Sequence, residues 1–167
     1  VPALLASAGA PVRQLQHRML LGQPIVEAQL GDGKVRLLDA RTAKPLPPVD
    51  GAAAALIARQ AYRGDRGSAP VIERIERPST EYRGALPAWR ASFPDADETR
   101  IYVAAETGRL TSVRTGTWRL YDFFWGLHIM DWTEHERLNT PWLNAFAAGG
   151  LVFAVAGAIL LFMRWPR

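Results

Sequence analysis

The sequence predicts an α+β protein with two helix-and-sheet units, an interfacial helix and one transmembrane helix. Three observations indicate this architecture. A weak internal repeat extends through residues 1–114, an aromatic segment with interspersed charges follows it, and the chain then runs from Pro141 to Met163 without a charged side chain. The repeat predicts small antiparallel sheets, and the last two segments predict a protein that is held at a membrane.

The internal repeat relates residues 12–42 to residues 71–107. Each copy starts with an apolar–polar–polar–apolar strand and continues with a second strand and a turn rich in Gly or Asp. Each copy then ends with a third strand and a turn that contains Thr. The turn Gly31-Asp32-Gly33 in the first copy is typical of a hairpin. We therefore expect three antiparallel strands in each copy.

A helix is predicted ahead of each copy, at residues 2–8 and at residues 50–62. Asp50 is placed to cap the second helix, and Leu56 and Ile57 are expected on its buried face. Each unit is thus one helix packed on one small sheet. The expected segments are a first unit over 1–48, a second over 49–116, a juxtamembrane helix over 117–138 and a transmembrane helix over 140–164.

The transmembrane helix is predicted because its apolar run is long enough to cross a bilayer. About 20 residues, at roughly 1.5 Å each, cross the hydrocarbon core. Thr140 is placed to cap the helix, and Pro141 fits its first turn. Trp142 and Trp165 bracket the run as an aromatic belt does. The alternative is a helix buried in the core of a domain.

Flanking charge predicts the orientation of this helix. Arg164 and Arg167 follow it without an acidic residue, whereas Asp131, Glu134 and Glu136 precede it. The positive-inside rule then places the C-terminus in the cytoplasm and residues 1–140 in the periplasm of a bacterial inner membrane. The chain has no cysteine, which is compatible with that compartment.

A stripe of small residues follows one side of the predicted span. Gly150, Ala154 and Ala158 are spaced by four, and this spacing lets a second helix approach closely. We expect a partner helix there, from another membrane protein or from a helix that precedes Val1. The alternative is that the stripe reflects only the composition of an apolar helix.

The segment 117–138 is predicted to be an amphipathic helix at the membrane surface. Trp118, Trp125 and Trp132 follow helical spacing, and acidic residues lie between them. Its apolar core is too short to cross a bilayer. The alternative is a core-facing helix that docks the domain on its anchor.

The chemistry that the sequence offers is sparse, so we predict no catalytic residue and no metal site, and we favour a protein without enzyme activity over an enzyme. The chain contains no cysteine, no glycine-rich phosphate loop and no hydrolase or metalloprotease motif. Its net charge of +4 is scattered along the chain, so nucleic-acid binding is not expected. His17 is expected to face solvent on a strand, and the acidic turn from Asp95 to Glu98 is expected at a solvated hairpin tip.

The residues that end the second copy resemble those of the PepSY family. The segment Ile101–Leu110 (IYVAAETGRL) is similar to the Y-V-D-x-x-T-G turn of that family, except that Ala104 replaces the usual acid. Leu127-His128 followed by a glycine-containing membrane helix resembles the PepSY-associated transmembrane proteins. The resemblance implies that a further membrane helix precedes Val1. The family includes peptidase propeptides, membrane-anchored accessory proteins and membrane reductases of the iron–siderophore type.

The resemblance gives His128 two interpretations. In the reductases of the family, membrane histidines bind haem, so His128 would be one haem ligand and a helix preceding Val1 would supply the other. We favour the second interpretation, an interfacial histidine packed on Trp125 and Trp132, because only one axial ligand is visible. His135 lies about 10 Å further along a helix and is too far to share one metal ion.

These expectations lead to one principal function and two alternatives. The principal one is a non-enzymatic accessory protein, held at the membrane and binding a partner protein, with membrane lipid as its surroundings and no cofactor. The first alternative is a haem-binding electron-transfer subunit of a reductase. The second alternative is a modulator of a peptidase.

Overall fold

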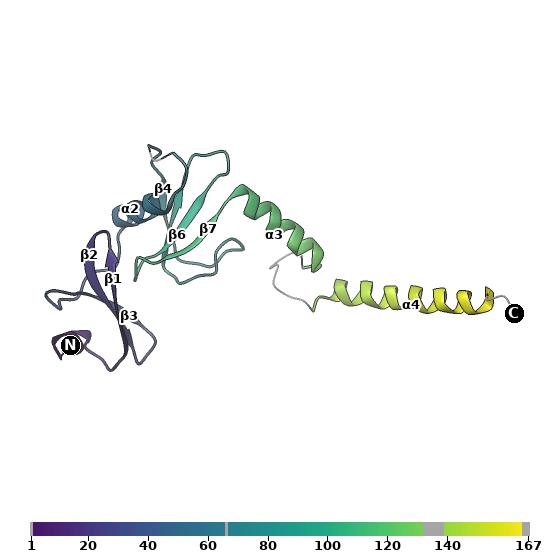
Figure 1. Cartoon of the computed structure of the whole chain (residues 1–167), viewed down its shortest axis with the longest axis horizontal. Helices are drawn as coiled ribbons and strands as arrows, with labels where there is room; N and C mark the ends of the chain where they lie inside the picture. The colour runs from purple at the N-terminus through teal and green to yellow at the C-terminus, as the bar shows by residue number, and fades with distance from the viewer. Residues whose placement is uncertain (1, 66, 132–138, 165–167) are drawn as a thin grey trace. The chain divides into compact units, whose positions relative to one another are not determined.

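The computed structural model describes residues 2–65, 67–131 and 139–164 (Figure 1). It contains two small antiparallel sheets, three helices and one C-terminal apolar helix, so the predicted α+β class is confirmed. The chain forms two compact units, Val1–Gly116 and Thr117–Arg167. Both sheets belong to the first unit.

The first sheet is a meander preceded by a short helix. Helix α1 (Pro2–Ala8) leads into β1 (Val12–Leu20), β2 (Gln23–Leu30) and β3 (Val35–Asp39), which pair antiparallel in the order β1-β2-β3. The predicted helix and three strands of the first copy are thus present. Val26 and Leu38 are fully buried on the paired strands and form the centre of this core with Ala8 of α1.

Each of the two hairpins of this sheet turns through residues with a positive φ. Leu21 and Gly22 connect β1 to β2 with φ values of 49° and 82°, the combination of a two-residue type I′ turn. The predicted Gly31–Gly33 turn connects β2 to β3, and Gly33 has a φ of 85°. The Leu30 N–H donates to the Lys34 carbonyl at 2.8 Å and closes this second hairpin.

The second sheet has four strands, one more than the repeat predicts. Strands β4 (Val71–Ile75), β5 (Ala88–Ser92), β6 (Arg100–Ala104) and β7 (Leu110–Arg114) pair antiparallel in chain order. The added strand is β7, which pairs with β6 after the turn at Gly108. The segment predicted as a terminal turn is therefore a hairpin.

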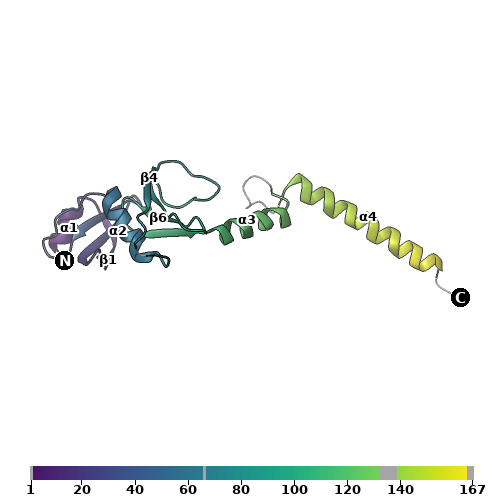
Figure 2. The same cartoon turned by 90° about the horizontal axis from the view of Figure 1, so that it is seen from above.

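Helix α2 (Gly51–Ala61) packs on β4, β5 and β6 (Figure 2). Asp50 caps it as predicted, because its carboxylate accepts the Ala53 N–H at 2.8 Å. The predicted buried face is wrong for Leu56, whose side chain is 53% exposed. Ala54 and Ala58 are fully buried instead, since these two small side chains lie one helical turn apart against the sheet.

Aromatic residues complete the core under α2. Trp89 packs against this core, and its indole N–H donates to the Val49 carbonyl at 2.7 Å. Phe93 stacks on Tyr62 with 3.8 Å between ring centroids. Trp89 and Phe93 therefore belong to the sheet core.

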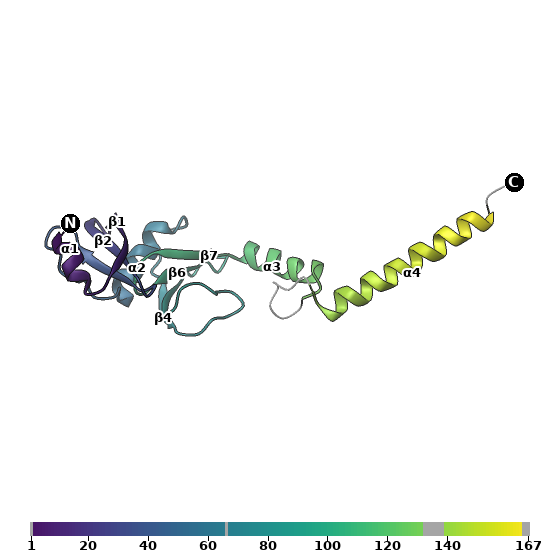
Figure 3. The same ribbon diagram turned by 90° about the horizontal axis from the view of Figure 1, so that it is seen from below.

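The opposite face of the second sheet is covered by the loop of residues 76–87, which joins β4 to β5 (Figure 3). Tyr82 of this loop stacks on Tyr102 of β6 with 4.4 Å between ring centroids, and both rings are 1% exposed. The Tyr82 hydroxyl also donates to the Ala85 carbonyl at 2.8 Å. The sheet is thus covered on both faces, by α2 and by this loop.

The second unit contains α3 (Gly116–His128) and α4 (Pro141–Arg164). Helix α3 begins at the predicted position but ends ten residues before the predicted residue 138. The rest of the predicted helix, residues 132–138, lies outside the described residues.

A Schellman motif ends α3 after His128. Met130 has a left-handed φ of 54°. The Asp131 N–H donates to the Gly126 carbonyl at 3.0 Å, and the Met130 N–H donates to the Leu127 carbonyl at 3.2 Å. These two bonds satisfy carbonyls of the last helical turn. The sequence did not predict this end because the left-handed position holds Met in place of the usual Gly.

Candidate functional site

Helix α4 is long and apolar enough to cross a membrane, and it is the one such helix in the described part of the chain. At about 1.5 Å per residue, its 24 residues extend over about 36 Å, against a hydrocarbon core of about 30 Å. None of its residues is buried. This finding is consistent with a single membrane span and gives no support to the alternative of a core helix.

The start of α4 is fixed by Thr140. Its hydroxyl oxygen accepts the Leu143 N–H at 3.2 Å, which is the predicted N-cap, and Pro141 occupies the first helical position. The same hydroxyl donates to the Met130 carbonyl at 3.1 Å. One side chain thus joins the end of α3 to the start of α4.

The small-residue stripe lies uncovered on α4. Gly150, Ala154 and Ala158 are all exposed. A Cβ added at Gly150 would meet nothing within 4 Å, and the same holds at Gly149 and Gly157. The helix surface is therefore open along this line to a second helix, whose presence stays a prediction.

The tryptophans predicted at the membrane interface are placed on both helices. Trp118 is half-buried near the start of α3, Trp125 is exposed near its end, and Trp142 is exposed in the first turn of α4. Trp132 and Trp165 lie outside the described residues. Their role at an interface is untested.

Helix α3 exposes a wide apolar face. At 100° per residue, its exposed large apolar side chains cover an arc of about 200°. They are Leu120, Tyr121, Phe123, Phe124, Trp125 and Leu127. A soluble domain rarely exposes so many neighbouring aromatic side chains without a binding partner. Gly126, by contrast, is buried on the other side of the helix.

His128 is the last residue of α3, and its side chain is exposed. Its ring lies against Trp125, with 6.0 Å between ring centroids and 35° between ring planes. His135 and Trp132 lie outside the described residues. Among the residues that the structure describes, no three His, Cys, Asp or Glu side chains form a metal-binding group. Haem binding by His128 stays a prediction.

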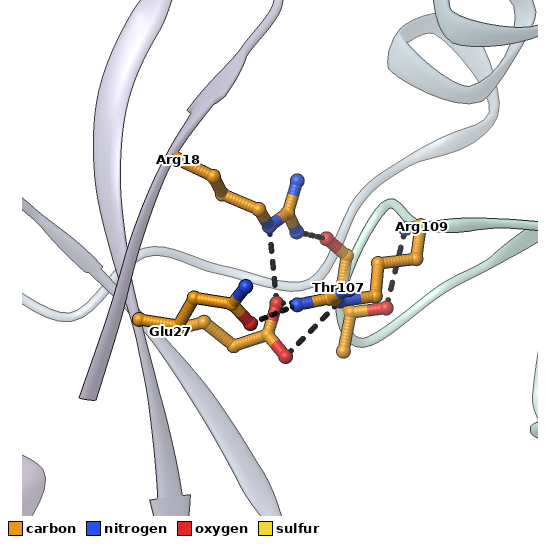
Figure 4. A network of polar contacts seen from close by, with 5 residues as sticks. Arg18, Glu27, Thr107 and Arg109 are labelled. Carbon is orange, nitrogen blue, oxygen red and sulfur yellow. Dashed lines mark hydrogen bonds and ion pairs between the residues drawn. The ribbon is translucent and has the colours of Figure 1, made fainter. Parts of the chain in front are cut away.

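A polar network joins the two sheets of the first unit (Figure 4). Glu27 of β2 accepts the Arg18 Nε–H at 3.0 Å and the Arg109 Nε–H at 2.9 Å. Arg18 also donates to the Thr107 carbonyl, and Arg109 donates to the Gln16 side chain at 2.5 Å. The network therefore links β1 and β2 to the turn between β6 and β7.

This turn is the PepSY-like segment of the sequence, and it is packed closely between the two sheets. Gly108 has a φ of 66°, which favours glycine. A Cβ on Gly108 would lie 2.9 Å from both Leu20 and Val49, which belong to the two halves of the unit. Only a glycine fits there without displacing its neighbours. The sequence predicted a turn here, but it did not predict that the turn lies between the two sheets.

Asp95 has a structural role in the loop between β5 and β6. Its carboxylate accepts the Thr99 N–H at 2.7 Å and the Tyr62 hydroxyl at 2.8 Å. Partial burial raises the pKa of Asp95, but the hydrogen bonds from Thr99 and Tyr62 outweigh it and hold the pKa below its ordinary value. The hydrogen bond to Asp95 raises the pKa of Tyr62.

Comparisons of the chain with protein-family models, with curated proteins and with solved structures found no match. The resemblance to the PepSY family therefore stays a proposal.

Proposed function

We propose that the protein is a non-enzymatic accessory subunit, anchored in a bacterial inner membrane by α4, whose domain of residues 1–116 lies in the periplasm. The observation that carries this proposal is that α4 is long, apolar and without a buried residue. An apolar helix of 24 residues with no buried position is stable in lipid and prone to aggregation in water.

Helix α3 supports the same proposal. The Thr140 hydroxyl holds the end of α3 beside the start of α4, which supports a position of that end at the membrane surface if α4 spans the membrane. The exposed aromatic side chains of α3 then lie at the depth of the lipid headgroups, where aromatic rings are favoured. Trp125 and His128 belong to this interfacial end.

The proposed role as a partner-binding subunit rests on the uncovered stripe of α4 and on the resemblance of the sequence of the first unit to the PepSY family. Each half of that unit is a helix followed by an antiparallel meander, as the family resemblance implies. The stripe of Gly150, Ala154 and Ala158 offers a smooth surface to a helix of another membrane protein.

The anchoring proposal is tested by partition of the full chain between membrane and soluble fractions after alkaline extraction. We expect the unaltered chain to remain in the membrane. The double variant Val155→Arg and Ile159→Arg should be released, because an arginine near the middle of a span, as at Val155, costs about 2.5–3.5 kcal/mol by insertion scales, and the second arginine adds a smaller cost. The matched control, Val155→Leu and Ile159→Leu, should stay in the membrane. Release of the unaltered chain would refute the anchor.

A further inference from the structure

The face of the second sheet opposite α2 carries a cavity of about 410 Å³. The end of β4, the loop of residues 76–87 and strands β5 and β6 form its walls. Its polar lining residues are Arg74, Glu76, Arg77, Ser79, Arg90 and Tyr102. Its volume falls within the range of about 300–1,000 Å³ that is typical of small-molecule sites.

Three of the lining residues are arginines. The Arg74 guanidinium lies over the Trp89 ring, 5.7 Å from its centroid, on the face that α2 covers, which leaves Arg77 and Arg90 to the opposite face. Arg74 pairs with Glu76 at 3.3 Å, and Arg90 pairs through Nη2 with Glu73 at 2.5 Å. Within the described parts of the chain, no acidic side chain pairs with Arg77. The cavity lining therefore keeps an excess of positive charge.

Arg90 presents a buried donor in addition to its ion pair. Its Nε atom is buried and lacks a hydrogen-bond partner among the described residues. A buried N–H without an acceptor is destabilising, so an acceptor within the cavity would stabilise the fold as well as bind. A guanidinium also offers two parallel N–H groups to the oxygens of one anion.

Two hydroxyl groups complete the set of donors. The phenol of Tyr102 is protonated at neutral pH, as any tyrosine is, and burial raises its pKa further. The Ser79 oxygen accepts the Tyr82 N–H at 3.2 Å, which leaves the Ser79 hydroxyl hydrogen to donate. Both groups can bind an anion but cannot neutralise its charge.

We propose that this cavity binds the phosphate group of a small molecule or of a lipid headgroup. A phosphate dianion carries more acceptor oxygens than a carboxylate, and it matches arginine and hydroxyl donors that come from several directions. The proposal does not depend on the accessory role proposed above.

The test is thermal unfolding of the full chain in a nonionic detergent, with inorganic phosphate added at constant ionic strength. We expect phosphate to raise the Tm of the unaltered chain, because a ligand that binds only the folded state stabilises it. Sodium acetate at the same ionic strength should give no rise. In Arg77→Ala the apparent Kd for phosphate should increase about tenfold or more, since one charge-assisted contact is lost.

Two further variants keep the test decisive. Arg90→Gln should also lose the response to phosphate, and Arg77→Ala decides alone if Arg90→Gln does not fold. Arg13→Ala is the matched control, because Arg13 is an exposed arginine on β1 of the other sheet, and it should respond like the unaltered chain. An equal response to phosphate in Arg77→Ala and in the unaltered chain would overturn the proposal, as would an equal response to acetate.

A second arm distinguishes the two sources of phosphate. A short-chain phosphatidic acid below its micellar concentration is titrated in the same way as inorganic phosphate. Much tighter binding of the lipid identifies a headgroup as the ligand, and equal binding identifies a free phosphate group. If neither compound raises the Tm of the unaltered chain more than that of Arg77→Ala, the proposal is contradicted.

Discussion

Glu27 joins the two sheets of the first unit through two arginines, Arg18 and Arg109, and its side chain is only 12% exposed. Replacing this partly buried carboxylate by a neutral amide leaves both arginines without their negatively charged partner. We expect Glu27→Gln to lower the free energy of unfolding by about 1–3 kcal/mol, measured by chemical denaturation. Asp32→Asn is the control, because Asp32 pairs with Lys34 at 3.8 Å on an exposed hairpin.

The control should change stability by less than about 0.5 kcal/mol, as exposed ion pairs do. If the two variants were equally stable, the network would be a surface feature and would not hold the sheets together.

Asp95 is expected to make the stability of the first unit depend on pH. Its pKa is lower in the folded state than its ordinary value of 3.8. A depressed pKa contributes stability above the unfolded value, and that stability is lost as pH falls through the folded value. Asp39 has the same direction of shift, owing to the Thr42 and Arg41 backbone N–H groups.

We therefore expect the unaltered chain to lose stability below about pH 4, and Asp95→Asn to reduce the slope in that range while Asp39 maintains part of it. Denaturation followed at several pH values measures both slopes. A slope unchanged by Asp95→Asn would show that the hydrogen bonds of Asp95 contribute nothing to acid unfolding.

His128 is expected to be an interfacial residue without a haem. The full chain purified in mild detergent should show no Soret band, and His128→Leu should leave its folding unchanged, because the exposed ring contacts Trp125 and needs no buried partner. A Soret band that disappears in His128→Leu but persists in His135→Leu would establish the haem alternative, since an axial ligand is required for such a site.

At the scale of elements, the sequence correctly predicted features that are determined by residues close together along the chain. The cap of α2 by Asp50, the cap of α4 by Thr140 and the glycine hairpin after β2 are all local, and all three were confirmed. The buried face of α2 was wrong at Leu56, because the sheet decides which side of an alanine-rich helix is covered. The end of α3 was wrong because Met130 adopts a conformation that glycine usually provides.

The small-residue stripe of α4 is the element with the clearest test of partner binding. Gly150→Leu combined with Ala154→Ile should weaken co-purification of a partner helix or of a second copy, because the larger side chains prevent close approach. Ala156→Leu is the matched control, since it adds similar volume about 200° around the helix from the stripe. If the double variant associates as well as the control and the unaltered chain, the stripe is not an interface.

At the scale of the molecule, the contacts that form the candidate sites were hidden from sequence reasoning. Arg109 and Gln16 are 93 positions apart and still meet in the network around Glu27. In the sequence, the arginines of the cavity were only part of the scattered positive charge. Arg77 and Arg90 line the same cavity because the loop of residues 76–87 folds over the sheet. Spacing along the chain describes one helix or strand and does not identify pairs between sheets.

The central claim is that α4 crosses a membrane once, with residues 1–116 on the outer side and the C-terminus in the cytoplasm. The most direct measurement fuses a reporter that is active only in the cytoplasm after Arg167, and in parallel one that is active only in the periplasm. Arg164 and Arg167 follow the span without an acidic residue, so the account predicts an active cytoplasmic reporter and a silent periplasmic one. An active periplasmic reporter with a silent cytoplasmic one would contradict it.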